Sequence, residues 1–89
     1  MIEKNVTIIN KLGLHARAAA KLISTTSQFG CDIRVNKAGK VVDAKSIMAV
    51  MMLAASQGTD LVVSTDGDDE QSAMDAILTL INNRFDEDE

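Results

Sequence analysis

The sequence lacks residues on which several common kinds of site depend. It has no tryptophan, tyrosine or proline, two phenylalanines and a single cysteine, Cys31. A lone cysteine cannot close an internal disulfide or supply half of a four-ligand zinc site. So few aromatic rings leave almost no platform for base stacking, and we expect no nucleic-acid partner. The longest apolar run covers only residues 47–55. Because a membrane-spanning helix needs about 20 apolar residues, no membrane insertion is expected.

Length and composition predict one folded domain over residues 1–89. The chain is 46% hydrophobic and 25% charged, an ordinary globular mixture and too apolar for a disordered chain. Its first residues lack the basic and apolar regions of a secretory signal, so we expect a cytoplasmic protein. No metal site or cofactor is predicted, because neither a second metal-ligating residue at suitable spacing nor a glycine-rich phosphate loop is present.

Charge is unevenly divided along the chain. Residues 1–45 carry eight Lys and Arg against three Asp and Glu, and residues 46–89 carry one against ten. The basic half suggests a face that meets an acidic partner or a phosphate. For the acidic ending, residues 86–89, the simpler interpretation is a solvated tail that favours solubility.

Hydrophobic periodicity predicts an α+β fold. Alternation of apolar and polar residues predicts strands at 2–9, 33–35, 41–42 and 61–65. Helical spacing predicts one helix from residue 16 to a stop at Gly30, a second at 46–55 and a third after Asp68. The order is βαββαβα, with three helices packed on one face of a four-stranded antiparallel sheet.

The last helix carries the clearest local signals. Asp68 is the expected N-cap, Gln71 its capping partner, and Arg84 the basic residue at the C-terminal end of the helix dipole. The expected buried stripe consists of Ala73, Ala76, Ile77, Leu80 and Ile81.

The only histidine, His15, stands directly before the first predicted helix and shortly after Gly13, which allows a tight turn. A helix N-terminus presents unpaired N–H groups and about half a positive charge, so it binds anions and disfavours a cationic imidazole. A neutral ring nitrogen can therefore act as a nucleophile. A phosphoryl group on His15 would meet the N–H groups of Ala16 and Arg17 and the Arg17 guanidinium. The alternative is a histidine that only caps the helix or lies on the surface.

Two segments resemble one known family. Residues 11–19, Lys-Leu-Gly-Leu-His-Ala-Arg-Ala-Ala, resemble the active-centre segment of HPr, the histidine-containing phosphocarrier of the bacterial phosphotransferase system. Residues 45–53, Lys-Ser-Ile-Met-Ala-Val-Met-Met-Leu, resemble the second signature of that family, around its serine site. The likeness spans essentially the whole chain. It implies the open-faced β-sandwich of the family, which agrees with the element order above.

This resemblance implies a phosphoryl carrier rather than a complete enzyme. Enzyme I would transfer a phosphoryl group from phosphoenolpyruvate to Nδ1 of His15, and His15 would pass it to a sugar-specific EIIA domain. Arg17 would orient and neutralise the phosphate in both transfers. For such a transient shuttle a monomer is the default expectation.

Ala18 departs from the family pattern, which usually has proline at this place. Proline suits the first turn of a helix because its missing N–H would be unpaired there in any case. Alanine keeps the helix, being the best helix former, and returns a free N–H. We expect phosphorylation to persist at a changed rate.

Ser46 has two interpretations, as the N-cap of the second helix and as a regulatory phosphorylation site. The second follows from its resemblance to the serine that HPr kinase/phosphorylase modifies in some bacteria. A phosphate at Ser46 would be favoured by the helix N-terminus and would add negative charge to the partner face.

The helix after Ser46 is apolar on all sides, so it has more apolar side chains than a single buried face can accommodate. We expect Val50 and Leu53 in the core. By analogy with the family, Ile47, Met48 and Met51 are the expected partner-facing residues, because methionines adapt to unlike partners. The basic residues Arg17, Lys21 and Lys45 would surround that patch and favour acidic partners.

Two functional alternatives stay open at this point. Within the family, the chain has features of the sugar-transport carrier and, in residues 10–15 and 85–89, of the nitrogen-related carrier NPr. Outside that role, it is a regulatory binding module that acts through the surface of the Ser46 helix.

Overall fold

One antiparallel sheet of four strands forms the framework of the computed structural model, which describes residues 1–89. The strands are β1 (Ile2–Thr7), β2 (Asp32–Lys37), β3 (Lys40–Asp43) and β4 (Asp60–Asp66). Their spatial order is β1-β4-β2-β3, so the first and last strands are neighbours. A tight turn at Ala38 and Gly39, both with positive φ, joins β2 to β3, as short hairpin turns require.

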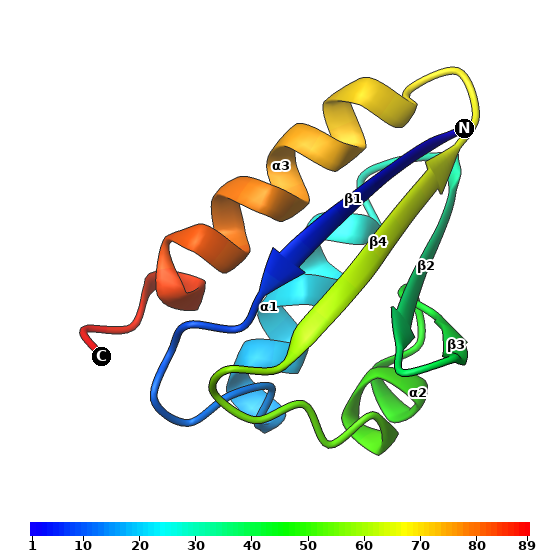
Figure 1. The fold of residues 1–89 in the computed structure, drawn as a ribbon. Coiled ribbons are helices and arrows are strands. Elements are labelled where there is room, and N and C mark those ends of the chain that lie inside the picture. Colours follow the sequence, from blue (N-terminus) through cyan, green and yellow to red (C-terminus); the bar gives the residue numbers. More distant parts are fainter.

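Three helices cover one face of this sheet, as Figure 1 shows. They are α1 (Ala16–Thr26), α2 (Ile47–Met52) and α3 (Glu70–Asn82), followed by the 3₁₀ turn η1 (Arg84–Asp86). The helix α1 packs against both α2 and α3, and α2 also contacts β3. None of the helices is both long and apolar enough to span a membrane.

The hydrophobic core lies between the sheet and the helices. Alternation along β4 buries Leu61, Val63 and Thr65 on the helix side, the two-residue period of a half-buried strand. The buried helix residues are Ala18, Ala19, Leu22 and Thr26 of α1, Val50 of α2, and Ala73, Met74, Ile77 and Ile81 of α3.

The predicted element order and layer arrangement are confirmed. The strands β2, β3 and β4 are longer than predicted, whereas β1, α1 and α2 are shorter. The strand β1 ends at Thr7, where regular pairing stops: the Ile8 N–H donates to the Thr59 carbonyl at 2.9 Å, but the Ile8 carbonyl accepts from Gly58 at 2.7 Å. The helix α1 ends at Thr26, before Gly30, and α2 occupies only residues 47–52 of the predicted range.

The predicted capping of α3 is wrong. The N-cap is Asp69, and its side chain makes no capping hydrogen bond. Its carboxylate instead accepts the N–H groups of Gly30 and Cys31, at 2.8 and 3.0 Å. Gln71 donates to Asp75 on the helix surface instead of acting as a capping partner. The helix therefore begins one residue later than the Asp68 cap predicts, and the carboxylate at its N-cap binds a distant segment instead of the helix.

Two further details of α3 differ from the prediction. Met74 joins Ala73, Ile77 and Ile81 in the buried stripe, whereas Ala76 and Leu80 are only partly buried. Arg84 lies outside the helix with a positive φ of 57°, so it is not in the last turn of α3.

Candidate functional site

His15 is the N-cap of α1, with the extended backbone (φ −74°, ψ 177°) usual at that position. Its ring nitrogen Nδ1 accepts a hydrogen bond of 3.3 Å from the backbone N–H of Arg17. Its carbonyl oxygen accepts the Ala19 N–H at 2.8 Å. The imidazole is therefore held at the positive end of the helix, where an anion is favoured.

The loop before His15 is fixed by a close approach to the segment after α2. Gly13 has a φ of +67°, and a Cβ atom there would lie 2.5 Å from the Ala55 carbonyl oxygen. The N–H of Leu14 donates to that same oxygen at 2.8 Å, and the Leu14 side chain is buried. Only glycine fits this approach, which sets the direction in which the chain enters α1.

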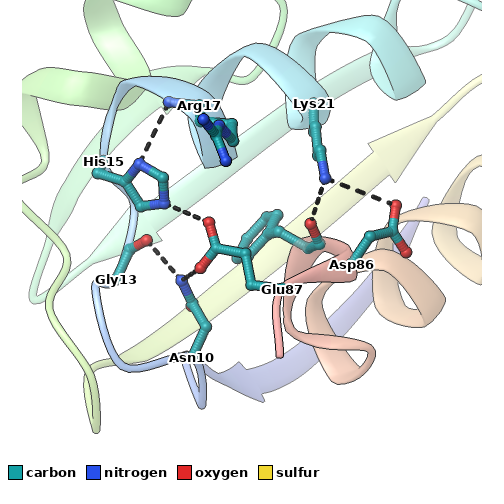
Figure 2. A network of polar contacts seen from close by, with 8 residues as sticks. Asn10, Gly13, His15, Arg17, Lys21, Asp86 and Glu87 are labelled. Atoms are coloured by element: carbon teal, nitrogen blue, oxygen red, sulfur yellow. Dashed lines mark hydrogen bonds and ion pairs between the residues drawn. The ribbon is translucent and has the colours of Figure 1, made fainter. Parts of the chain in front are cut away.

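A second segment reaches the ring from the far end of the chain. Figure 2 shows the Glu87 carboxylate between the His15 imidazole and the Asn10 amide. One carboxylate oxygen, Oε2, contacts Nε2 of His15 within hydrogen-bonding distance. The other, Oε1, accepts from Nδ2 of Asn10 at 3.0 Å. Nδ2 of Asn10 also donates to the Gly13 carbonyl at 2.8 Å, so this buried amide joins the loop to the C-terminal segment.

These contacts lower the pKa of Glu87 below its ordinary value. The largest cause is the hydrogen bond from Asn10, and the hydrogen bond from His15 and the charges of His15 and Lys21 act in the same direction. Partial burial of the carboxylate opposes the shift. The site therefore holds an ionised carboxylate against the imidazole at neutral pH.

The C-terminal segment is folded onto α1, so the interpretation of residues 86–89 as a freely solvated tail is wrong for Glu87. Phe85 is fully buried and anchors the segment. Lys21 donates to the Phe85 carbonyl at 2.8 Å and lies 3.9 Å from the Asp86 carboxylate. The N–H of Lys11 donates to the Glu89 carbonyl at 2.9 Å. A run of acidic residues is a property of neighbours in the sequence. It therefore does not predict that the segment packs against α1.

The first turn of α1 supplies the other predicted phosphate-binding groups. Ala16 and Arg17 are its first two residues and both are exposed. The Arg17 side chain makes no ion pair or hydrogen bond within the chain and stands beside His15 in Figure 2. Ala18 is fully buried and its N–H has no partner, which is the situation in which proline would also be tolerated.

Ser46 is the N-cap of α2, as the capping interpretation predicted. Its hydroxyl oxygen accepts the Ala49 N–H at 3.3 Å, and its carbonyl accepts the Val50 N–H at 3.0 Å. The hydroxyl is only partly buried.

The expected division of α2 between core and surface is confirmed. Val50 and Leu53 are buried. The exposed fractions are 39% for Ile47, 71% for Met48 and 42% for Met51, and Met52 is 65% exposed as well. These four side chains are called the α2 apolar face below.

The three basic residues predicted to surround that face differ in their contacts. Lys21 is engaged with the C-terminal segment, and Lys45 donates to the Phe29 carbonyl at 2.7 Å. Of the three, only Arg17 has a charged group without a partner in the chain. Their part in partner binding stays a prediction.

Asn10 and Glu87 are the site residues that sequence reasoning missed. Glu87 lies 72 residues from His15 in the chain, and it stands in a run of four acidic residues that are otherwise exposed. For Asn10, the only signal in the sequence is a polar residue directly after the predicted strand 2–9, which ends in two isoleucines. That signal indicates a loop and gives no hint that the amide is buried.

The chain is similar to known phosphocarrier proteins. Residues 2–83 match the family model described as the PTS HPr component phosphorylation site. Phosphocarrier protein HPr of Cupriavidus necator is 56% identical over 89 residues and is covered completely, as is this chain. Phosphocarrier protein NPr of Shewanella violacea is 41% identical, over 97% of this chain and 94% of its own length.

Solved structures show the same architecture. The crystal structure of HPr-C-His from Thermoanaerobacter tengcongensis has a TM-score of 0.97 and 46% identity, with full coverage of both chains. A structure described as an HPr dimer from the same bacterium has a TM-score of 0.79 and 47% identity, covering 98% of this chain and 100% of that one. The predicted open-faced sheet with three helices is thus confirmed, and the chain belongs to the HPr family of phosphocarrier proteins of the phosphotransferase system.

Proposed function

We propose that His15 accepts a phosphoryl group from Enzyme I, derived from phosphoenolpyruvate, and passes it to EIIA components that support sugar uptake and its regulation. The observation that carries the proposal is the position of His15. Its imidazole caps α1 with Nδ1 turned toward the N–H of Arg17, in a chain of the HPr family. A phosphate on Nδ1 would lie at the positive end of the helix, which stabilises it by about 0.3–1 kcal/mol.

Arg17 has the part of a phosphate ligand in this proposal. Its guanidinium is exposed and unpaired, so it can form charge-assisted bonds to phosphate oxygens without first breaking a bond inside the protein. The N–H groups of Ala16 and Arg17 complete the binding set. In this scheme the chain carries the group between partners as one cytoplasmic domain over residues 1–89 and works as a monomer.

The experiment is mass spectrometry of the protein incubated with phosphoenolpyruvate, Mg²⁺ and Enzyme I at alkaline pH, where phosphohistidine survives. One acid-labile phosphate is expected, absent from His15→Ala and present in Ser46→Ala as the matched control. No phosphate on the wild-type protein, with Enzyme I active on another carrier, would contradict the proposal.

The α2 apolar face, on a helix that packs against α1, supports docking of Enzyme I and EIIA domains. Ile47, Met48 and Met51 expose flexible apolar surface that can repack against unlike partners. The same face supports the second candidate, a regulatory binding module. The first candidate requires that His15→Ala abolish phosphoryl transfer to EIIA, whereas the second requires that binding of a partner survive this substitution.

Ser46 is the proposed regulatory site for HPr kinase/phosphorylase. A hydroxyl that is partly accessible at the start of α2 can accept a phosphate that the N-terminal N–H groups would favour. Incubation with a cognate kinase and ATP is expected to add one acid-stable phosphate, and its absence would remove this site. Of the two branches, the sugar-transport carrier is favoured over NPr by the higher identity to HPr sequences.

A further inference from the structure

The two ring nitrogens of His15 face groups of opposite hydrogen-bonding character. Nδ1 faces a donor, the backbone N–H of Arg17. Nε2 faces a pure acceptor, the ionised carboxylate of Glu87. A neutral imidazole carries one proton, and only the form protonated on Nε2 satisfies both neighbours. In that form, the lone pair is on Nδ1, the nitrogen at the helix N-terminus.

We propose that Glu87 is a positioning residue for His15, whose carboxylate holds the ring proton on Nε2 and thereby makes Nδ1 the nitrogen that accepts the phosphoryl group. This inference rests on the proposed function of His15 and adds to it the residue that selects the reacting nitrogen. Carboxylates that bind one nitrogen of a histidine orient the ring and fix its tautomer in the same way in catalytic and metal sites.

Glu87 is itself held in place, as a positioning residue must be. Its Oε1 accepts from the buried amide of Asn10, and the preceding Phe85 anchors the backbone in the core. Asn10 directs both of its N–H donations at acceptors, Glu87 and the Gly13 carbonyl, and leaves its own Oδ1 buried without a partner. A buried oxygen without a partner costs free energy, and the reversed amide would set that oxygen against two other acceptors. The orientation is therefore fixed.

The transfer step follows from this tautomer. The lone pair of Nδ1 forms a bond to phosphorus, while the bond between phosphorus and the donor atom of Enzyme I breaks and its electron pair stays with the donor. Nδ1 has no proton to lose, so the ring of the product carries a positive charge with the proton still on Nε2. The Glu87 carboxylate lies against that proton and stabilises the charge. The reverse movement of electrons passes the group to the next acceptor.

The first test uses the fact that His15 is the only histidine. The protein is labelled with ¹⁵N-histidine, and both ring nitrogens are observed by NMR at alkaline pH. In the wild type, we expect a protonated Nε2 whose proton exchanges slowly with water, and an unprotonated Nδ1. In Glu87→Ala, we expect loss of the Nε2 proton signal and movement of both nitrogen shifts toward their averaged values. Unchanged shifts and exchange in this variant would overturn the proposal.

The second test measures phosphorylation by Enzyme I and phosphoenolpyruvate. Glu87→Ala is expected to lower kcat about tenfold with KM for the protein changed little, because Glu87 acts on the ring and not on docking. The matched control is Asp88→Ala, which removes the same charge from an exposed neighbour and should change neither kcat nor the NMR signals. Equal loss in both variants, or an effect on KM alone, would contradict the proposal. Failure of the proposed function would look different, because the wild type itself would then take up no phosphate while the NMR comparison could still be made.

Discussion

Arg17 contributes two groups to the site, and they have separate tasks. Its backbone N–H binds Nδ1 of His15, and any residue except proline would supply that group. Arg17 is exposed, and its guanidinium makes no hydrogen bond or ion pair within the chain. Only the guanidinium is therefore specific to arginine, and in the proposed function it binds the phosphate.

Substitution of Arg17 should consequently change transfer and leave stability unchanged. We expect Arg17→Ala to slow phosphoryl transfer by about a hundred- to a thousandfold, since a donor to the transferred group is lost. Arg17→Lys should fall between the two, because an ammonium keeps the charge without the planar fork. Transfer rates with Enzyme I and thermal melts measure both effects. If Arg17→Ala lowered the melting temperature enough to explain the slower transfer by unfolding, the guanidinium would have a structural role, which would contradict this prediction.

Substitutions at Gly13 and Gly58 distinguish two causes of destabilisation when a glycine is replaced, which are backbone strain and steric overlap. Both have positive φ, +67° and +89°, but a Cβ at Gly13 would meet the Ala55 carbonyl at 2.5 Å, whereas Gly58 has open space. Gly58→Ala should cost about 1–2 kcal/mol of stability from backbone strain. Gly13→Ala should cost about 1–3 kcal/mol more through overpacking. Urea unfolding of the two variants provides the comparison, and equal losses would show that the close approach is unimportant.

At the scale of the elements, Asp69 joins the loop after α1 to the start of α3. Its carboxylate accepts the N–H groups of Gly30 and Cys31. The hydrogen bond from Gly30 is the largest cause that lowers the pKa of Asp69 below its ordinary value. The same contact favours the charged form only in the folded protein. Two elements far apart in sequence are thus connected by one ionised side chain.

The sign of the resulting pH dependence follows from that lowered pKa. The unfolded chain binds the Asp69 proton at higher pH than the folded one, so the contribution is complete above about pH 4. It is lost as the pH falls through the lower pKa of the folded state. Urea midpoints should therefore separate wild type from Asp69→Asn at pH 7, and the gap should narrow at acid pH. A constant gap would assign the effect to packing.

At the scale of the whole molecule, the two halves of opposite charge meet at the site. The acidic C-terminal segment lies on the basic first half through Lys21 and the backbone of Lys11. The apolar anchor of this contact is Phe85, which is fully buried although its φ is positive at 54°. The segment therefore folds back because its one aromatic side chain completes the core.

Removal of that anchor should affect fold and site together. We expect Phe85→Ala to lower the free energy of unfolding by about 3–5 kcal/mol, the usual cost of deleting a buried aromatic ring. It should also release Glu87 from His15. Asp88→Ala, on the exposed surface, should stay within about 0.5 kcal/mol. Chemical denaturation gives both values, and a loss below 1 kcal/mol for Phe85→Ala would mean that the segment is not anchored by its ring.

Sequence reasoning reached the sheet, the helices and the residues of the first turn of α1 because these depend on local signals. Apolar alternation, helical spacing and the caps at His15 and Ser46 all act within a few residues. It failed at Asp68 and Gln71, because the N-cap is Asp69 and its carboxylate binds the N–H groups of Gly30 and Cys31 instead of capping the helix. It also failed at the ends of the elements, where neighbouring segments decide how far pairing extends.

The sequence by itself determined that a single histidine precedes a helix beside an arginine, and with it the class of chemistry that this helix end can support. Only the tertiary structure decided which ring nitrogen faces the helix and which faces a carboxylate. Glu87 and His15 are 72 residues apart, and no periodicity or local propensity extends over that separation. Their contact depends on the burial of Phe85 and on the amide of Asn10, which are properties of the packed core and not of any segment.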